Sequence, residues 1–275
     1  MNQTQTETDS QSELDASRMP FMGHLAELRK RLMISALAAG IGFGICYPFK
    51  ERLLAFMIDP LKAVLPPGQR LIYTNLPEAF FTYLKICFLA GGLLALPVVF
   101  LQIWRFIAPG LYKKERKFAF GFVISSTVLF LGGAIFGYQV VFPFGFKFFV
   151  GFESELITPL PALKAYLSFS VRLLLAFGAI FELPIVIFFL AKMGLVTDKF
   201  LRKNRKWALL LTFVTGAIFT PPDVVTQVLM ALPLIILFEI SIFVAKAFGP
   251  KAKPDKDDEQ DGDSPDPGPD KSEDH

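Results

Sequence analysis

Long apolar runs without charge constrain this fold more than any other feature of the sequence. Residues 118–142 contain no Asp, Glu, Lys or Arg over 25 positions. A bilayer core about 30 Å thick is crossed by about 20 apolar helical residues, because an α-helix rises about 1.5 Å per residue. Hydrophobic residues make up 53% of the chain, above the roughly 45–50% of soluble domains. The sequence therefore predicts an all-α integral membrane protein.

The apolar runs predict six transmembrane helices, of which the last two are short. The final run is divided at Thr220–Asp223, where Pro221 and Pro222 disfavour helix before them and Thr220 with Asp223 forms a capping pair. The fifth helix would then have only about 20 Å of apolar length. The predicted spans cover residues 32–47, 76–104, 118–142, 166–191, 207–219 and 221–245.

Positive charge predicts the orientation of these spans. Nineteen Lys and Arg flank one set of helix ends and only six occupy the opposite loops. Because cytoplasmic segments are enriched in Lys and Arg, both termini are expected in the cytoplasm. Polar residues 1–20 and the Pro- and Asp-rich residues 250–275 are too poor in apolar residues to form a core. We therefore expect a six-helix transmembrane domain over residues 21–249 between two disordered tails.

The loops and the scarce reactive residues narrow the possible functions. Residues 49–75 predict an interfacial helix stopped by Pro60, and the aromatic stretch 143–165 is expected to cap the same outer face. Cys46 and Cys87 both lie in apolar runs, which favours buried thiols over a disulfide. Two His and no nucleotide or hydrolase motif leave no metal site, no cofactor and no enzymatic activity expected.

Two acidic residues lie in the last apolar runs. Glu182 is near the bilayer midplane, where an ionised carboxylate costs about 2.5–3.5 kcal/mol, and Pro184 after it favours a kink. Glu182 is either a protonated group bonded to nearby backbone or a polar contact for a partner helix or transported species. Glu239 lies nearer the inner face, and its role is equally open between structure and function.

Two further acidic residues are surrounded by cations at the inner face. Glu27 lies in HLAELRKRL (24–32) and Glu115 in YKKERK (112–117). Each could form local ion pairs at i+3 or i+4, as Glu27 could with Lys30 and Arg31; exposed pairs contribute only about 0.2–1 kcal/mol. Together they could instead present two carboxylates to a cationic segment. A guanidinium binds a carboxylate in two-pronged fashion, whereas an ammonium does not.

Four segments together resemble the TatC family, the large subunit of the twin-arginine protein translocase. They are HLAELRKRL (24–32), IAPGLYKKERK (107–117), FGAIFELPIV (177–186) and TPPDVVTQVLMALPLIILFEI (220–240). The resemblance implies a concave six-helix bundle in a bacterial or archaeal cytoplasmic membrane. It also implies a receptor that binds the twin-arginine signal peptides of folded proteins. Export would use the proton-motive force and take place within a multimeric complex that also contains single-span TatA/TatB-type subunits and does not bind nucleic acid.

The resemblance also assigns roles to individual positions. The signal-peptide surface would comprise Glu27, Arg29, Phe106, Pro109, Leu111, Tyr112 and Glu115. Glu182 matches the acid of the intramembrane groove that contacts single-span partners, and Glu239 is expected to join that contact. Pro60 and Asp223 match residues of the outer face.

Two other classes of function fit parts of the sequence. An ion-coupled transporter of small solutes would use Glu182, Arg172 and Glu239 as a relay, although six spans without an evident repeat argue against it. A passive membrane scaffold would tolerate neutralisation of either inner-face acid. The receptor alone predicts that a twin-arginine peptide crosslinks near Glu27 or Glu115 better than a twin-lysine peptide does.

Overall fold

The computed structural model describes residues 3–107, 119–154, 156, 158–219 and 224–249. Every regular element in these residues is a helix, which confirms the predicted all-helical architecture, and one isolated backbone bridge pairs Ile72 with Ala162. The elements are α1 (Gln3–Cys46), η1 (Tyr47–Phe49), α2 (Lys50–Lys62), α3 (Glu78–Ile107), α4 (Ala119–Phe136), η4 (Gly137–Val141), α5 (Phe142–Val150), α6 (Leu163–Phe181), α7 (Leu183–Lys192), α8 (Asp198–Lys203), α9 (Arg205–Phe219) and α10 (Val224–Phe248).

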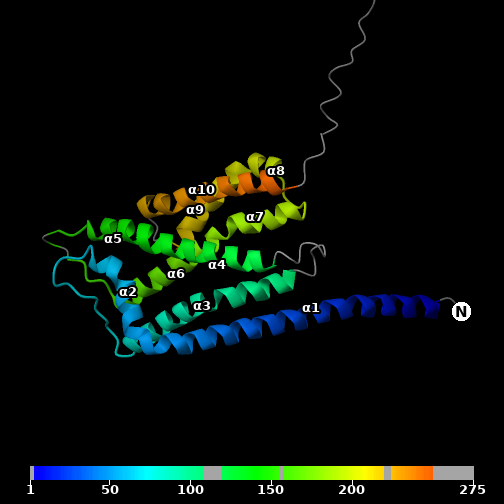
Figure 1. Ribbon diagram of the computed structural model, residues 1–275, viewed down its shortest axis with the longest axis horizontal. Helices are drawn as coiled ribbons and strands as arrows, with labels where there is room; N and C mark the ends of the chain where they lie inside the picture. The colour runs from blue at the N-terminus through cyan, green and yellow to red at the C-terminus, as the bar shows by residue number, and fades with distance from the viewer. Residues whose placement is uncertain (1–2, 108–118, 155, 157, 220–223, 250–275) are drawn as a thin grey trace, which may run out of the picture.

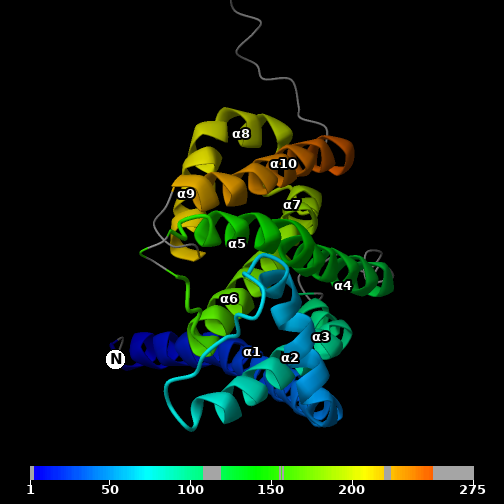
Figure 2. The ribbon, with the colours of Figure 1, turned by 90° about the vertical axis from the view of Figure 1, so that its left-hand side faces the viewer.

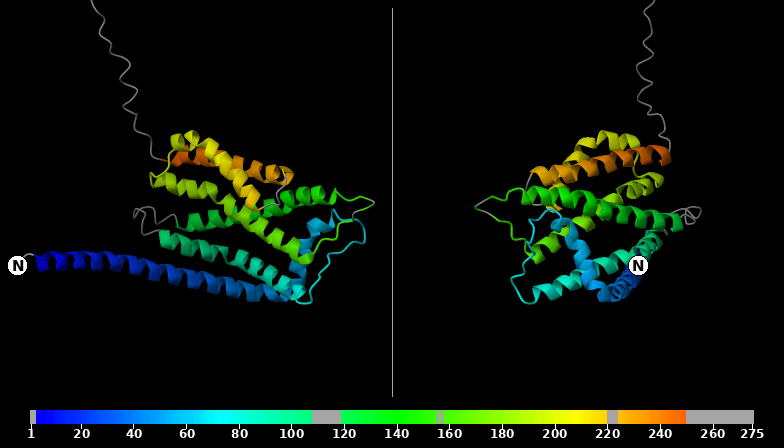
Figure 3. Two further views of the ribbon diagram at one scale, coloured as in Figure 1. Left: turned by 180° about the vertical axis from the view of Figure 1, so that it is seen from behind. Right: turned by 60° about the vertical axis from the view of Figure 1, so that its left-hand side comes forward.

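Three groups of helices follow one another across the molecule. In Figure 1 α1 and α3 lie along one side, α4 to α7 form the middle, and α8 to α10 lie on the other side. The end-on view in Figure 2 keeps the same order. One end of the bundle carries α2, the start of α3 and the start of α6, and we name it the loop end. The opposite end carries the end of α3, the start of α4 and the end of α10, and we name it the basic end (Figure 3).

Five helical stretches in the described part of the chain are long and apolar enough to cross a bilayer. They are Gly23–Lys62, Glu78–Ile107, Phe120–Val150, Leu163–Lys192 and Met230–Phe248. The predicted division of the last apolar run is present, because α9 ends at Phe219 and α10 begins at Val224. α9, with 15 residues, is as short as predicted, whereas the 25 residues of α10 correct the expectation that both final helices are short.

The first helix is longer than the sequence predicted. α1 begins at Gln3, so residues expected to form a disordered tail continue the helix of the first span. Residues 3–18 contain neither Pro nor Gly, and extending an existing helix avoids the cost of a new nucleus. The acidic residues 250–275 lie outside the described residues.

The third span also extends past its predicted end at Phe142. η4 is a π-helix, in which the Phe142 N–H donates to the Gly137 carbonyl, and α5 continues from there to Val150. Pro143 sits in the first turn of α5, where a missing backbone N–H is tolerated. The extra residue in the π turn lets the chain pass this proline without ending the helix.

Pro60 does not stop α2 as predicted. It is buried within the last turn of a helix that continues to Lys62. A proline inside a helix removes a hydrogen bond to the carbonyl four residues earlier, here that of Phe56. The Tyr138 hydroxyl donates to this Phe56 carbonyl at 2.6 Å, and the Tyr166 hydroxyl donates to the Met57 carbonyl at 2.6 Å. Side chains of η4 and α6 therefore satisfy the backbone that the proline disturbs.

Glycines bring α1 and α3 into backbone contact. A Cβ on Gly42 would overlap the Gly91 carbonyl, and a Cβ on Gly91 would overlap the Phe43 amide, so only glycine fits at either position. Near this crossing Cys46 and Cys87 are free thiols, and the expected burial holds for Cys87, whereas Cys46 is partly exposed. The largest buried apolar cluster lies toward the loop end and joins α2, α3, α5, α6 and α10.

Candidate functional site

Glu27 already holds a guanidinium group at the basic end. The Arg31 Nη2 atom lies 2.7 Å from Glu27 Oε1, one helical turn along α1. Both side chains are partly buried, with 32% of Glu27 and 23% of Arg31 exposed. This contact is the i,i+4 pair that the sequence predicted.

Gln102 of α3 is a member of this site that the sequence analysis missed. Its Oε1 accepts a hydrogen bond from Arg31 Nη1 at 3.4 Å, and its side chain is buried. Arg31 therefore bridges two helices, while its buried Nε has no hydrogen-bond partner among the described residues. A lone amide in the apolar run FLQIW was the available signal.

A ring stack fixes the position of α1 against the end of α3. The His24 and Phe106 rings lie 4.4 Å apart with planes 22° from parallel. Phe106 was predicted as part of the recognition surface, and this stack places it one turn of α1 from Glu27. Arg29 and Lys30, between Glu27 and Arg31 in the sequence, are exposed. The structure thus brings together the predicted residues of α1 and the end of α3.

The remaining predicted members of this surface lie outside the described residues. Pro109, Leu111, Tyr112 and Glu115 belong to the segment that joins Ile107 of α3 to Ala119 of α4. Both of these helix ends are at the basic end (Figure 3). The chain on either side of Glu115 is therefore anchored at the end of the bundle that carries Glu27.

Glu182 lies at a break in the fourth apolar helix. α6 ends at Phe181 and α7 begins at Leu183, with Pro184 in its first turn, so the kink expected from this proline is present. The Ser126 hydroxyl of α4 lies near the Glu182 carboxyl. Glu182 Oε1 and Ser126 Oγ are nevertheless buried, and neither has a partner at hydrogen-bond geometry among the described residues. Glu182 thus leaves a buried acceptor unsatisfied.

Glu239 forms an ion pair rather than an isolated intramembrane acid. Its Oε2 lies 2.7 Å from Arg205 Nη2, and the two side chains are 48% and 47% exposed. The pair joins α10 to the first residue of α9 at the basic end. This contact stabilises the hairpin of the last two helices, and it could not be predicted from the sequence because the partners are 34 residues apart.

The relay required of a solute transporter is not assembled by these contacts. Glu239 pairs with Arg205, Glu182 faces Ser126, and Arg172 lines a hollow with Lys85. Each member of the supposed relay therefore has a different neighbour. In the described ranges, no cluster of three or more His, Cys, Asp or Glu could hold a metal ion.

The chain is similar to known protein translocase subunits over most of its length. The family model "Sec-independent protein translocase protein (TatC)" matches residues 23–233. The TatC protein of Desulforapulum autotrophicum is 52% identical over 88% of this chain and 90% of its own. That of Helicobacter pylori strain J99 is 41% identical over 86% and 93%.

A solved structure agrees in fold as well as in sequence. The crystal structure of the twin-arginine translocase receptor TatC is 42% identical, covers 81% of this chain and 97% of its own, and superposes with a TM-score of 0.72. A second structure of that receptor, in the detergent DDM, gives 0.73 at the same identity. By these matches and its apolar helices, the chain belongs to the TatC family and is a membrane-protein subunit of the Sec-independent protein translocase.

Proposed function

We propose that this chain is the receptor subunit that binds twin-arginine signal peptides at the basic end of the bundle. Glu27 and Glu115 each accept one arginine of the signal. Arg29, Phe106, Pro109, Leu111 and Tyr112 form the surrounding surface, and the apolar part of the signal enters between helices. Single-span TatA/TatB-type subunits join the receptor in a multimeric complex that exports the folded protein.

The contact between Glu27 and Arg31 is the observation that carries this proposal. A carboxylate that holds a guanidinium at 2.7 Å while one third of it remains exposed can exchange that guanidinium for another. Arg31 keeps its second contact, to Gln102, when the signal arginine takes its place. The interfacial position strengthens the new ion pair relative to bulk water. A lysine ammonium lacks the planar fork that fits a carboxylate.

The proposed membrane placement has six spans with the basic end in the cytoplasm. The excess of Lys and Arg at this end supports it. α9 is the fifth span, although its 15 residues reach only about 22 Å. A thinner bilayer or neighbouring helices accommodate so short a helix. Both termini are then cytoplasmic, in a bacterial or archaeal cytoplasmic membrane.

Glu182 is proposed as the contact for a single-span partner helix. Its unsatisfied buried oxygen at the α6–α7 break supports this role, because a buried acceptor without a donor is unfavourable and a partner side chain supplies one. Glu239 contributes at the basic end, and Pro60 and Asp223 maintain the outer face. Transport draws on the proton-motive force.

Photo-crosslinking tests the docking site directly. A photoreactive residue replaces Tyr112, three positions before Glu115 in the sequence, and membranes are incubated with a twin-arginine or a twin-lysine signal peptide. We expect a strong adduct with arginine and a weak one with lysine. Glu115→Lys should abolish the adduct while the protein still accumulates in the membrane. Equal adducts from the two peptides, or an unchanged adduct in Glu115→Lys, would contradict the proposed docking.

The partner contact needs a separate experiment. Glu182→Ala should leave the signal adduct unchanged and lower the amount of single-span subunit that co-purifies. Ser126→Ala, which removes the nearby hydroxyl but keeps the acid, is the matched control and should retain the partner. Normal co-purification with Glu182→Ala would assign this acid to the fold instead.

A further inference from the structure

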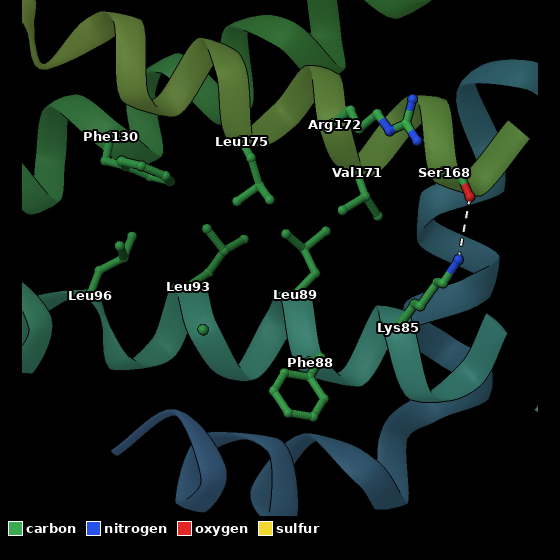
Figure 4. Close-up of a pocket in the computed structure, with 11 residues that line it drawn as sticks. Lys85, Phe88, Leu89, Leu93, Leu96, Phe130, Ser168, Val171, Arg172 and Leu175 are labelled. Atoms are coloured by element: carbon green, nitrogen blue, oxygen red, sulfur yellow. Dashed lines mark hydrogen bonds between the residues drawn. The ribbon is translucent and has the colours of Figure 1, made fainter. Parts of the chain in front are cut away.

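A narrow hollow lies between α3 and α6, away from the site at the basic end. Its volume is about 530 Å³, within the range of ligand pockets. Figure 4 shows Leu89, Leu93 and Leu96 pointing from α3 toward α6, with Val171 and Leu175 pointing back from α6. Phe130 of α4 closes the deep end of this slot. The walls along this part of the hollow are therefore apolar.

Two cations, Lys85 of α3 and Arg172 of α6, line the other end of the slot. Lys85 Nζ donates to Ser168 Oγ at 3.4 Å, and Arg172 follows Ser168 by one helical turn on α6 (Figure 4). Within the described residues, Arg172 has neither an ion pair nor a hydrogen bond. The acid nearest along α3, Glu78, is occupied by the backbone amides of Thr74 and Lys164. The two positive charges thus have no counter-charge from these helices.

The depth of the cations corresponds to a membrane interface. α3 has 30 residues, about 45 Å, so a centred hydrocarbon core of about 30 Å begins roughly 7 Å from Glu78. Lys85 lies about 10 Å along α3, and Arg172 lies about 13 Å from Leu163 along α6. Both side chains are exposed and long enough to reach that boundary from inside the apolar layer.

The length of the slot corresponds to one leaflet. Leu96 lies 11 residues beyond Lys85 on α3, about 16 Å deeper, and half of a hydrocarbon core is about 15 Å. The polar end of the hollow is the end nearer the start of both helices, and the apolar end lies at the midplane. This order of charge and apolar surface is the order of headgroup and acyl chain in the leaflet at the loop end.

We propose that this hollow is a binding site for one anionic phospholipid of the loop-end leaflet. The lipid phosphate lies between Lys85 and Arg172, with the Ser168 hydroxyl as an additional donor. One acyl chain follows Leu89, Leu93 and Leu96 to Phe130. The bound lipid fills the space between α3 and α6 and neutralises charges that the protein leaves unpaired. This inference does not depend on the proposed receptor function.

Native mass spectrometry of the purified full-length chain in detergent tests the site. The protein is titrated with phosphatidylglycerol, with phosphatidylcholine of the same acyl chains, or with inorganic phosphate. We expect phosphatidylglycerol to be retained in preference to phosphatidylcholine. Lys85→Gln and Arg172→Gln should each lower its affinity about fivefold, and the double variant about 25-fold, because each cation contributes separately. Arg172→Lys should retain affinity within about twofold.

Arg52→Gln provides the matched control, since Arg52 is an exposed guanidinium on α2 at the same end of the bundle. It should bind phosphatidylglycerol as the wild type does. Equal retention of the two lipids, or equal losses in Arg172→Gln and Arg52→Gln, would overturn the site. If millimolar inorganic phosphate displaced the lipid, the two cations would be a site for a free anion and the lipid proposal would be wrong. If the double variant keeps its lipid but loses a co-purifying single-span subunit, the occupant is an acidic helix and the proposal is wrong.

Discussion

At the loop end the Tyr166 hydroxyl and the Glu78 carboxylate are enclosed by the fold, whereas at the basic end the carboxylates of Glu27 and Glu239 stay partly exposed. The Tyr166 hydroxyl is buried against a carbonyl of α2, and the Glu78 carboxylate accepts two backbone amides. At the basic end, Glu27 instead forms an ion pair with the Arg31 side chain. Glu239 forms one with Arg205, and both of these side chains are about half exposed. Backbone contacts are permanent parts of a fold, but side-chain ion pairs at a surface exchange readily. The difference agrees with the proposed receptor surface at the basic end and with a supporting role for the loop end.

The helix crossing that connects the two ends gives the largest expected effect. Gly42→Ala should lower the free energy of unfolding by about 3 kcal/mol, because the new methyl overlaps the Gly91 carbonyl and forces α1 from α3. Gly44→Ala, two residues away in open space, should be neutral or slightly stabilising. Denaturation of both variants in detergent micelles measures the difference. Equal stability would indicate that the ends do not depend on this crossing.

The second prediction concerns Glu27, the acid that is proposed to exchange Arg31 for a signal arginine. Glu27→Gln keeps the size of the side chain and removes its charge, so signal-peptide affinity should fall about 30-fold, or about 2 kcal/mol. The unfolding free energy should change by less than about 1 kcal/mol, because the lost pair with Arg31 is partly exposed. Peptide titration and denaturation are measured on the same preparation. A large stability loss with intact binding would make Glu27 a structural acid like Glu78.

At the loop end we expect the reverse pattern, a loss of stability without a loss of peptide binding. Tyr166→Phe removes the hydroxyl that satisfies the Met57 carbonyl, so stability should fall by about 1–2 kcal/mol while signal-peptide affinity stays unchanged. Tyr73→Phe is the control, because Tyr73 is more than half exposed. If Tyr166→Phe weakened peptide binding at full stability, the loop end would be part of the receptor surface rather than a support for it.

The smallest effect is expected at the ion pair between the last two helices. Glu239→Gln should cost less than about 1 kcal/mol, because both partners are about half exposed. Molar salt should remove most of the difference from the wild type, since the screening length then falls to about 3 Å. Unfolding at low and high salt measures both effects. A salt-independent loss above about 2 kcal/mol would place this pair among the enclosed polar groups.

The sequence predicted the helices better than their ends. Charge-free runs gave the all-helical class, and the Thr-Pro-Pro-Asp segment correctly separated α9 from α10. The predicted helix ends were wrong where tertiary contacts compensate for a proline. Pro60 is tolerated inside α2 because the Tyr138 hydroxyl donates a hydrogen bond to the Phe56 carbonyl. Pro143 is tolerated because it follows a π turn. Donors distant in the sequence cannot be assigned from local pattern.

In the candidate site, only the contact within a single helix was predictable from the sequence. The Glu27–Arg31 pair follows from helical spacing. Gln102, His24 against Phe106, and Arg205 with Glu239 come from different helices, so no periodicity relates them. Lys85 and Arg172 line one hollow only because α3 packs on α6.

By itself, the sequence determined that the chain forms apolar helices, where most of them lie and which of their ends are basic. These properties follow from hydropathy, charge and backbone rules that act within a few residues. Only the tertiary structure decided that Gly42 meets Gly91, that a buried amide receives Arg31, and that two cations share one slot. Such contacts depend on how helices far apart in the chain cross, and crossing is set by side-chain packing over the whole bundle.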